Sequence, residues 1–123
     1  MSKSSVKLYD STLRDGAQTK GVNFSLDDKL KIYKLLSDIG VDYIEGGWPG
    51  ANPTDDNFFK KVSHKSRSKL VAFGMMRKSG KSANNDPGLN AVLNSGVSSV
   101  CLVGKTWDFH VKNALKVSYS ENL

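Results

Sequence analysis

The stretch VKLYDSTLRDGAQ, residues 6–18, joins an apolar run to a group of polar side chains. Val6 to Thr12 is short and largely apolar, which predicts a buried β-strand. Arg14 and Asp15 follow it side by side, and Gln18 comes three residues later. Neighbours on an extended chain point to opposite faces, so we expect the two charges to meet different partners rather than each other.

An apolar strand followed by a helix recurs along the whole chain, at a spacing of about 30 residues, the size of a βα unit. Strands are predicted at Val6–Thr12, Val41–Glu45, Lys69–Gly74 and Val97–Gly104. A capping-box pair, Ser25 and Asp28, predicts the first helix, which should end at Gly40. Its expected apolar face is Leu26, Leu30, Tyr33, Leu36 and Ile39. The second helix is expected to begin near Thr54 or Asp55, the third with Asp86 as cap before Pro87, and the last with Asp108 as cap.

This alternation implies a parallel sheet with right-handed crossovers. Two folds fit, an open doubly wound sheet or part of a (β/α)₈ barrel. Open-sheet nucleotide-binding folds usually carry a phosphate loop after the first strand, but residues 11–18 match neither common glycine pattern. Glycines also follow the other strands, at Gly46, Gly74 and Gly104. We therefore predict an α/β fold: the N-terminal half, four βα units, of a TIM barrel.

Composition places the chain among globular proteins. It has 123 residues, of which 38% are hydrophobic. No apolar run approaches the roughly 20 residues that span a membrane, and residues 1–10 lack a signal-peptide core, so we expect a cytoplasmic protein without membrane contact. The single cysteine, Cys101, excludes an internal disulfide and is expected to be a buried, inert thiol.

The net charge is +6, and residues 60–81 contain eight basic side chains and no acid. Such a run can bind nucleic acid, can bind an anionic small molecule that carries phosphates, or can be an ordinary solvated surface. We favour the last reading and expect no nucleic-acid partner.

Polar side chains gather where the predicted strands end. In parallel folds the carboxyl ends of the strands meet on one rim, which holds the site. A carboxylate there is a hard ligand for Mg²⁺, Mn²⁺ or Zn²⁺, and a guanidinium can bind carboxylates and enolates. Glu45 could orient Arg14 or assist a proton transfer. The alternative is that these charges only pair with one another. The candidates are Arg14, Asp15, Gln18, Glu45, Arg77 and Lys105.

The residues LRDGAQ, 13–18, followed after ten residues by Lys29, fit the signature L-R-[DE]-G-x-Q-x(10)-K of the isopropylmalate and homocitrate synthase family. Residues 9–32 and 40–55 resemble most closely its citramalate synthase branch, with Trp48 in EGGWPG as the local indication. The resemblance extends over nearly the whole chain from Lys7 on.

The resemblance implies a TIM-barrel acyltransferase that condenses acetyl-CoA with a 2-oxo acid, aided by a divalent metal ion. For the citramalate branch the acceptor is pyruvate and the product is (R)-citramalate, on the way to isoleucine. Asp15 matches the metal-binding aspartate, Arg14 the arginine that stabilises the developing oxyanion, and Glu45 the catalytic glutamate that supports it. Gln18 matches a substrate-binding glutamine. Arg77 and Lys105 are further substrate-binding candidates, and the whole enzyme is expected to be a homodimer.

The family's other metal ligands form an H-x-H pair on a later strand, and this chain has no H-x-H. We therefore expect residues 1–123 to be a partial, truncated catalytic domain of the pyruvate-carboxyltransferase type, inactive by itself. Three alternatives stay open: another 2-oxo-acid acceptor, as in isopropylmalate or homocitrate synthase; a related metal-dependent acyl-CoA lyase; or a non-enzymatic half-barrel that binds a partner or nucleic acid.

Overall fold

The computed structural model describes residues 5–123. Its main elements are β1 (Tyr9–Asp10), α1 (Leu26–Asp38), β2 (Tyr43–Gly47), α2 (Pro53–Lys61), β3 (Lys69–Met75), α3 (Pro87–Leu93) and β4 (Ser99–Val103). Short helical segments complete the chain: 3-10 helices at Gly16–Gln18 and Ala83–Asn85, α4 (Asp108–His110), a π-helix at Val111–Leu115 and α5 (Tyr119–Asn122).

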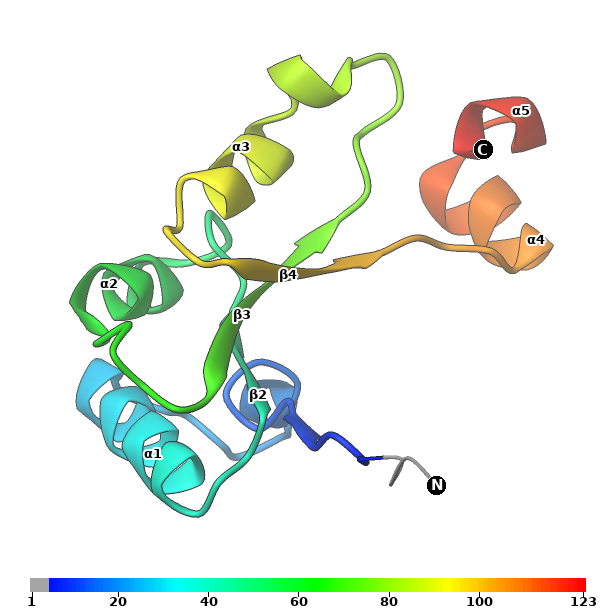
Figure 1. Cartoon of the computed structure of the whole chain (residues 1–123). Helices are drawn as coiled ribbons and strands as arrows, with labels where there is room; N and C mark the ends of the chain where they lie inside the picture. The colour runs from blue at the N-terminus through cyan, green and yellow to red at the C-terminus, as the bar shows by residue number, and fades with distance from the viewer. Residues whose placement is uncertain (1–4) are drawn as a thin grey trace.

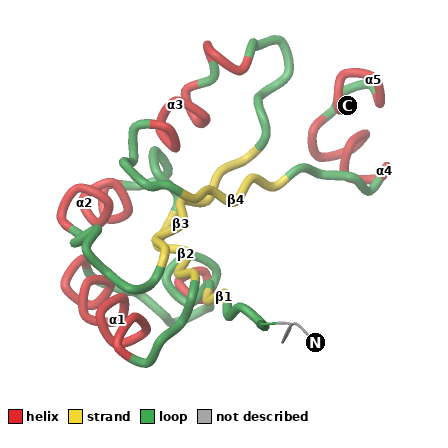
Figure 2. The backbone as a smooth tube through the Cα atoms, in the orientation of Figure 1, coloured by secondary structure: helices red, strands yellow, loops and turns green. Residues whose placement is uncertain are grey.

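The strands form one parallel sheet in the order β1-β2-β3-β4. Each strand therefore pairs with the next along the chain, as in a barrel, whereas a doubly wound sheet reverses its strand order at a switch point. Figure 1 shows α1, α2 and α3 along one side of the strands, and Figure 2 shows the N-terminal loop close to β1 and β2, with β4 at the other edge of the sheet. The prediction of four βα units of a TIM barrel is confirmed.

The core lies between the sheet and these helices. Ile44, Leu70 and Ala72 point from the strands onto Phe58 of α2 and its neighbours, and all are buried. Burial of each large apolar side chain contributes about 1.5–3 kcal/mol. At Gly46 the approach is so close that a Cβ would lie 2.5 Å from Cε1 of Phe58. Glycine at this position thus lets α2 pack directly on β2.

Most predicted helix ends are confirmed. Ser25 and Asp28 form the capping box of α1, Gly40 follows α1 with φ of +90°, and Asp86 caps α3. The prediction that Thr54 or Asp55 lies near the start of α2 is confirmed: the helix begins at Pro53, and its cap is Asn52, whose side chain accepts the backbone N–H of Asp55. Ile39 differs from the prediction: it is 76% exposed, at the last turn of α1, beyond the part that packs on the sheet.

The first strand is shorter than the predicted Val6–Thr12. Just before and just after it, backbone N–H groups bond to acidic side chains instead of to the backbone of a neighbouring strand. The Asp42 carboxylate accepts the N–H of Leu8 at 2.9 Å. Asp10 accepts the N–H and the hydroxyl of Thr12, at 2.9 and 3.0 Å. These local bonds stop β1 after two residues and begin the turn that carries Arg14.

The last βα unit differs from the others. Asp108 is the first residue of α4 instead of its cap, and α4 passes into the π-helix after three residues. Figure 1 shows α4 and α5 beyond the end of β4, away from the other helices. Cys101 on β4 is half-buried rather than buried, because β4 has a strand neighbour on one side only among residues 5–123. No helix in the described range is long and apolar enough to cross a membrane.

Candidate active site

The turn after β1 places Arg14. The backbone N–H groups of Arg14, Asp15 and Gly16 all point at the carbonyl of Ser11, at 3.2, 2.8 and 3.2 Å. Leu13 is fully buried in the core and anchors the turn. Because this segment is not extended, the expectation that Arg14 and Asp15 point apart is wrong: Nη1 of Arg14 lies 3.2 Å from Oδ1 of Asp15.

Arg14 also forms an ion pair with Glu45 of β2, through Nε and Oε1. The Arg14 side chain is 19% exposed and that of Glu45 only 2%. The hydroxyl of Tyr9 donates to the other carboxylate oxygen of Glu45. Burial, and next the bond to Glu45, raises the pKa of Tyr9 far above its usual value, so the phenol stays protonated and remains a donor. Two donors thus fix a buried carboxylate.

Aromatic rings hold the guanidinium from its face. Cζ of Arg14 lies 4.1 Å from the ring centroid of Phe73 on β3, and Trp48 packs edge-on against Phe73 at 5.1 Å. A cation over an aromatic face is attracted by the ring quadrupole. Nη2 of Arg14 has no hydrogen-bond partner among residues 5–123. The arginine is therefore oriented by protein contacts and keeps one nitrogen for a ligand.

The signature lysine, Lys29, supports the neighbouring loop. Its side chain is 2% exposed and pairs with Asp55 at the start of α2. The second oxygen of Asp55 accepts the N–H of Trp48 at 2.8 Å. A Cβ on Gly47, whose φ is +156°, would lie 2.6 Å from Cγ of Asp55. The pair thus fixes the β2–α2 loop and, through the Trp48 ring, the wall behind Phe73.

The sequence analysis did not include three parts of this site among its candidates: Tyr9, Phe73 and the Lys29–Asp55 pair. Tyr9 and Phe73 lie within strands and look like ordinary core residues. Lys29 did carry a signal, because it falls on the same helical face as Leu26, Leu30 and Tyr33. A lysine on a buried face needs a charged or polar partner.

The structure brings Arg14, Asp15 and Glu45 into contact but not the other three candidates. Gln18 is exposed in the 3-10 helix after the turn. Arg77 donates to Glu121 at 2.9 Å and to the carbonyl of Lys81 at 3.1 Å. Lys105 is half-buried, and its carbonyl accepts a bond from Asn122 at 2.8 Å.

A metal ion would find one ligand at this site. The Asp15 side chain is 64% exposed, and only its Oδ1 is near Arg14. Within residues 5–123 there is no group of three or more His, Cys, Asp or Glu side chains that could hold a metal. Asp15 can therefore supply one metal ligand, and the described residues do not form a complete metal site.

Comparisons with known proteins find relatives over nearly the whole chain. The chain is 46% identical over 121 residues to the (R)-citramalate synthase of Sulfolobus acidocaldarius and 47% identical over 120 residues to that of Aquifex aeolicus. These alignments cover 97% and 96% of this chain but 23% of each relative. The 2-isopropylmalate synthase of Sulfolobus acidocaldarius is 31% identical over 118 residues, which are 96% of this chain and 29% of that protein.

The fold has a counterpart among solved structures, the HMG-CoA lyase of Bacillus subtilis, with a TM-score of 0.69 at 23% identity. The match covers 95% of this chain and 38% of that one. The chain thus spans under a quarter of the curated citramalate synthases it matches and just over a third of this structure. The model of the HMGL-like family matches residues 5–123. The chain therefore belongs to the HMGL-like family.

Proposed function

We propose that the protein containing this chain is an acyltransferase that condenses acetyl-CoA with pyruvate to give (R)-citramalate and CoA. One observation carries the proposal. Two enzymes of the same organism, Sulfolobus acidocaldarius, match almost the same residues, the citramalate synthase at 46% identity and the 2-isopropylmalate synthase at 31%. Because both enzymes come from one organism, divergence between species cannot explain the difference in identity. The difference therefore supports pyruvate as the acceptor.

In the reaction, the methyl carbon of acetyl-CoA loses a proton and bonds to the keto carbon of pyruvate. The keto oxygen becomes an alkoxide and takes a proton, and water then cleaves the thioester to release CoA. Negative charge develops on the keto oxygen, and a fixed cation beside it lowers the barrier. We assign that role to Nη2 of Arg14. Glu45 and Tyr9 hold the guanidinium in place, so little reorganisation is needed during the step.

A divalent metal ion, Mg²⁺, Mn²⁺ or Zn²⁺, would polarise the keto group when bound. Asp15 would supply one carboxylate ligand, and the others would come from outside the described residues. Gln18, Arg77 and Lys105 stay proposed substrate contacts. Of these, Gln18 is supported by its place next to the turn, whereas Arg77 would first have to leave Glu121. Lys105 is bonded to Asn122 through its backbone carbonyl, a contact that does not involve its ammonium group. We further propose that the whole enzyme is a homodimer, that it is cytoplasmic, and that its product is used on the way to isoleucine.

The second candidate is the same condensation with another acceptor, as in 2-isopropylmalate synthase, because that relative matches the same stretch. The test uses protein expressed from its complete reading frame. CoA release is followed with acetyl-CoA and, in turn, pyruvate, 2-oxoisovalerate and 2-oxoglutarate. We expect kcat/KM to be highest for pyruvate by at least about tenfold, as a pocket can discriminate side chains that differ by two methyl groups. A preference for 2-oxoisovalerate would overturn the citramalate assignment.

A further inference from the structure

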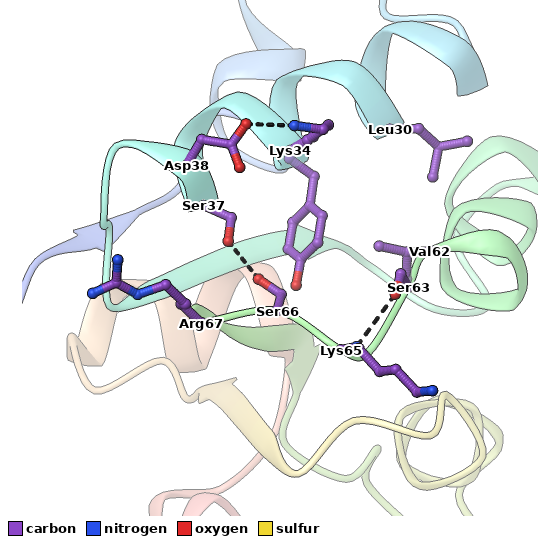
Figure 3. Close-up of a pocket in the computed structure, with 10 residues that line it drawn as sticks. Leu30, Lys34, Ser37, Asp38, Val62, Ser63, Lys65, Ser66 and Arg67 are labelled. Carbon is purple, nitrogen blue, oxygen red and sulfur yellow. Dashed lines mark hydrogen bonds and ion pairs between the residues drawn. The ribbon is translucent and has the colours of Figure 1, made fainter.

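A cavity of about 530 Å³ lies between the end of α1 and residues 62–67, the loop that leads into β3 (Figure 3). This loop enters the sheet at the amino end of β3, so the cavity is at the opposite end of the strands from Arg14. Its volume is in the range of small-molecule sites. Nothing in the proposed reaction uses it.

The charges around this cavity are predominantly positive. Figure 3 shows Lys34, Lys65 and Arg67 around it, together with one acid, Asp38. Asp38 is already paired with Lys34 at 2.5 Å. Neither Lys65 nor Arg67 has an ion-pair partner among residues 5–123. Two positive charges from the basic segment, residues 60–81, therefore line one cavity without a counter-charge in the described part of the chain.

Hydroxyl groups add donors at the same place. Tyr33 lines the cavity and is 5% exposed, and within the described part of the chain its buried hydroxyl has no hydrogen-bond partner. Buried polar groups almost always have a partner, so such a hydroxyl calls for an explanation. Ser37 and Ser66 lie 2.5 Å apart through their Oγ atoms, and only one of the two can donate to the other. One more hydroxyl proton is thus available to an acceptor.

We propose that this cavity binds a small phosphate ester. A phosphoryl group carries up to two negative charges and three terminal acceptor oxygens, which charged and hydroxyl donors can bind. Arg67 and Lys65 extend away from each other on opposite sides of the cavity (Figure 3), so we infer that Arg67 turns inward to meet the phosphoryl group beside the Tyr33 hydroxyl, and that Lys65 adds its charge from the other side. The cavity is larger than one phosphate needs, and Leu30 and Val62 form an apolar part of its wall. That part suits the organic portion of an ester. The site lies apart from Arg14, so it stands whether or not the proposed reaction is right.

The test measures binding of two probes, phenyl phosphate and inorganic phosphate, to the intact protein by isothermal titration calorimetry. We expect saturable binding, tighter for the ester. Arg67→Gln should weaken the affinity for phenyl phosphate at least about tenfold, because it removes a charge-assisted bond. Tyr33→Phe should weaken it several-fold while keeping the ring in the core. Lys61→Gln is the matched control: it removes one charge from the same basic segment outside the cavity and should change the affinity less than twofold.

Three results would overturn the proposal. The first is no saturable binding of either probe by a protein whose circular dichroism shows the native fold. The second is equal loss in Lys61→Gln and Arg67→Gln, which would mean that only the general surface charge attracts the anion. The third is equal affinity for the two probes, which would remove the assignment to an ester. Unfolding provides a separate check: without ligand Tyr33→Phe should be at least as stable as the parent protein, and saturating phenyl phosphate should raise the melting temperature of the parent protein more than that of the variant.

Discussion

Arg14 and Glu45 form an ion pair in which the carboxylate is almost completely buried. The two residues are 31 positions apart and lie on consecutive βα units. Tyr9 donates to the same carboxylate from β1, and Phe73 covers the guanidinium from β3. Three neighbouring strands therefore hold one arginine. Such a fixed cation is what a developing oxyanion requires, and the predictions below test this arrangement.

Replacement of Arg14 by lysine keeps the charge but removes the planar fork that meets Glu45, Asp15 and the substrate at once. We expect kcat to fall about 10²- to 10³-fold, as when an oxyanion donor is removed, with a smaller change in KM. Steady-state kinetics on the intact protein would measure both. Lys61→Arg exchanges the same two side chains in the opposite direction, at an exposed position at the end of α2, and should keep the parent rate. A kcat for Arg14→Lys within twofold of the parent value would exclude Arg14 from the reaction.

The buried Lys29–Asp55 pair should be important for stability. Lys29→Met leaves Asp55 charged and buried without its partner, so we expect a loss of about 3–5 kcal/mol in the free energy of unfolding. Urea titration followed by circular dichroism would measure it. Lys34→Met, on the same helix, breaks an exposed pair with Asp38 and should cost less than about 1 kcal/mol. Similar losses in the two variants would show that the buried pair has no special role.

Much of this architecture was readable from sequence, and the exceptions have physical causes. Strand and helix order followed from apolar periodicity, and Ser25, Gly40 and Asp86 marked helix ends because capping depends on a few neighbouring residues. Long-range contacts were less accessible. The sequence placed Arg14 and Glu45 on one rim, but it could not show that Tyr9 reaches Glu45 across the sheet or that Lys29 pairs with Asp55. Both contacts depend on strand register and on how α1 and α2 pack.

Asp86 should make stability depend on pH. Its carboxylate accepts the N–H of Lys78 at 2.8 Å and of Leu89 at 3.0 Å. These bonds, first the one from Lys78, hold its pKa below the ordinary value for an aspartate. A lowered pKa means that the folded state binds the proton less well than the unfolded state. The stabilisation is thus complete above the unfolded pKa and is lost as pH falls toward the folded one.

We therefore expect Asp86→Asn to lower stability at pH 7 and to reduce the fall in stability between about pH 5 and pH 2. Thermal unfolding across that range would show a flatter profile for the variant. Asp27→Asn removes an exposed acid in the first turn of α1 and should leave the profile unchanged. If the Asp86→Asn and parent profiles are parallel, Asp86 does not contribute to the acid transition.

The outer strand β4 presents apolar side chains to solvent. Val100, Leu102 and Val103 are all exposed, and an uncovered strand edge invites pairing with another chain. Residues 1–123 expressed by themselves should therefore associate at micromolar concentration. Leu102→Lys should reduce this association, and sedimentation velocity would measure it. Lys112→Gln, an exposed change away from the sheet, is the control. A strictly monomeric parent chain would contradict the prediction.

The central claim, that this protein joins acetyl-CoA to pyruvate, is tested most directly by the identity of the product. The intact protein is incubated with acetyl-CoA, a divalent metal ion and pyruvate labelled with ¹³C at all three carbons, and the products are analysed by mass spectrometry. We expect citramalate that carries all three labelled carbons, formed in equal amount to the CoA released. No labelled citramalate, or CoA release at the same rate without pyruvate, would contradict the proposed function.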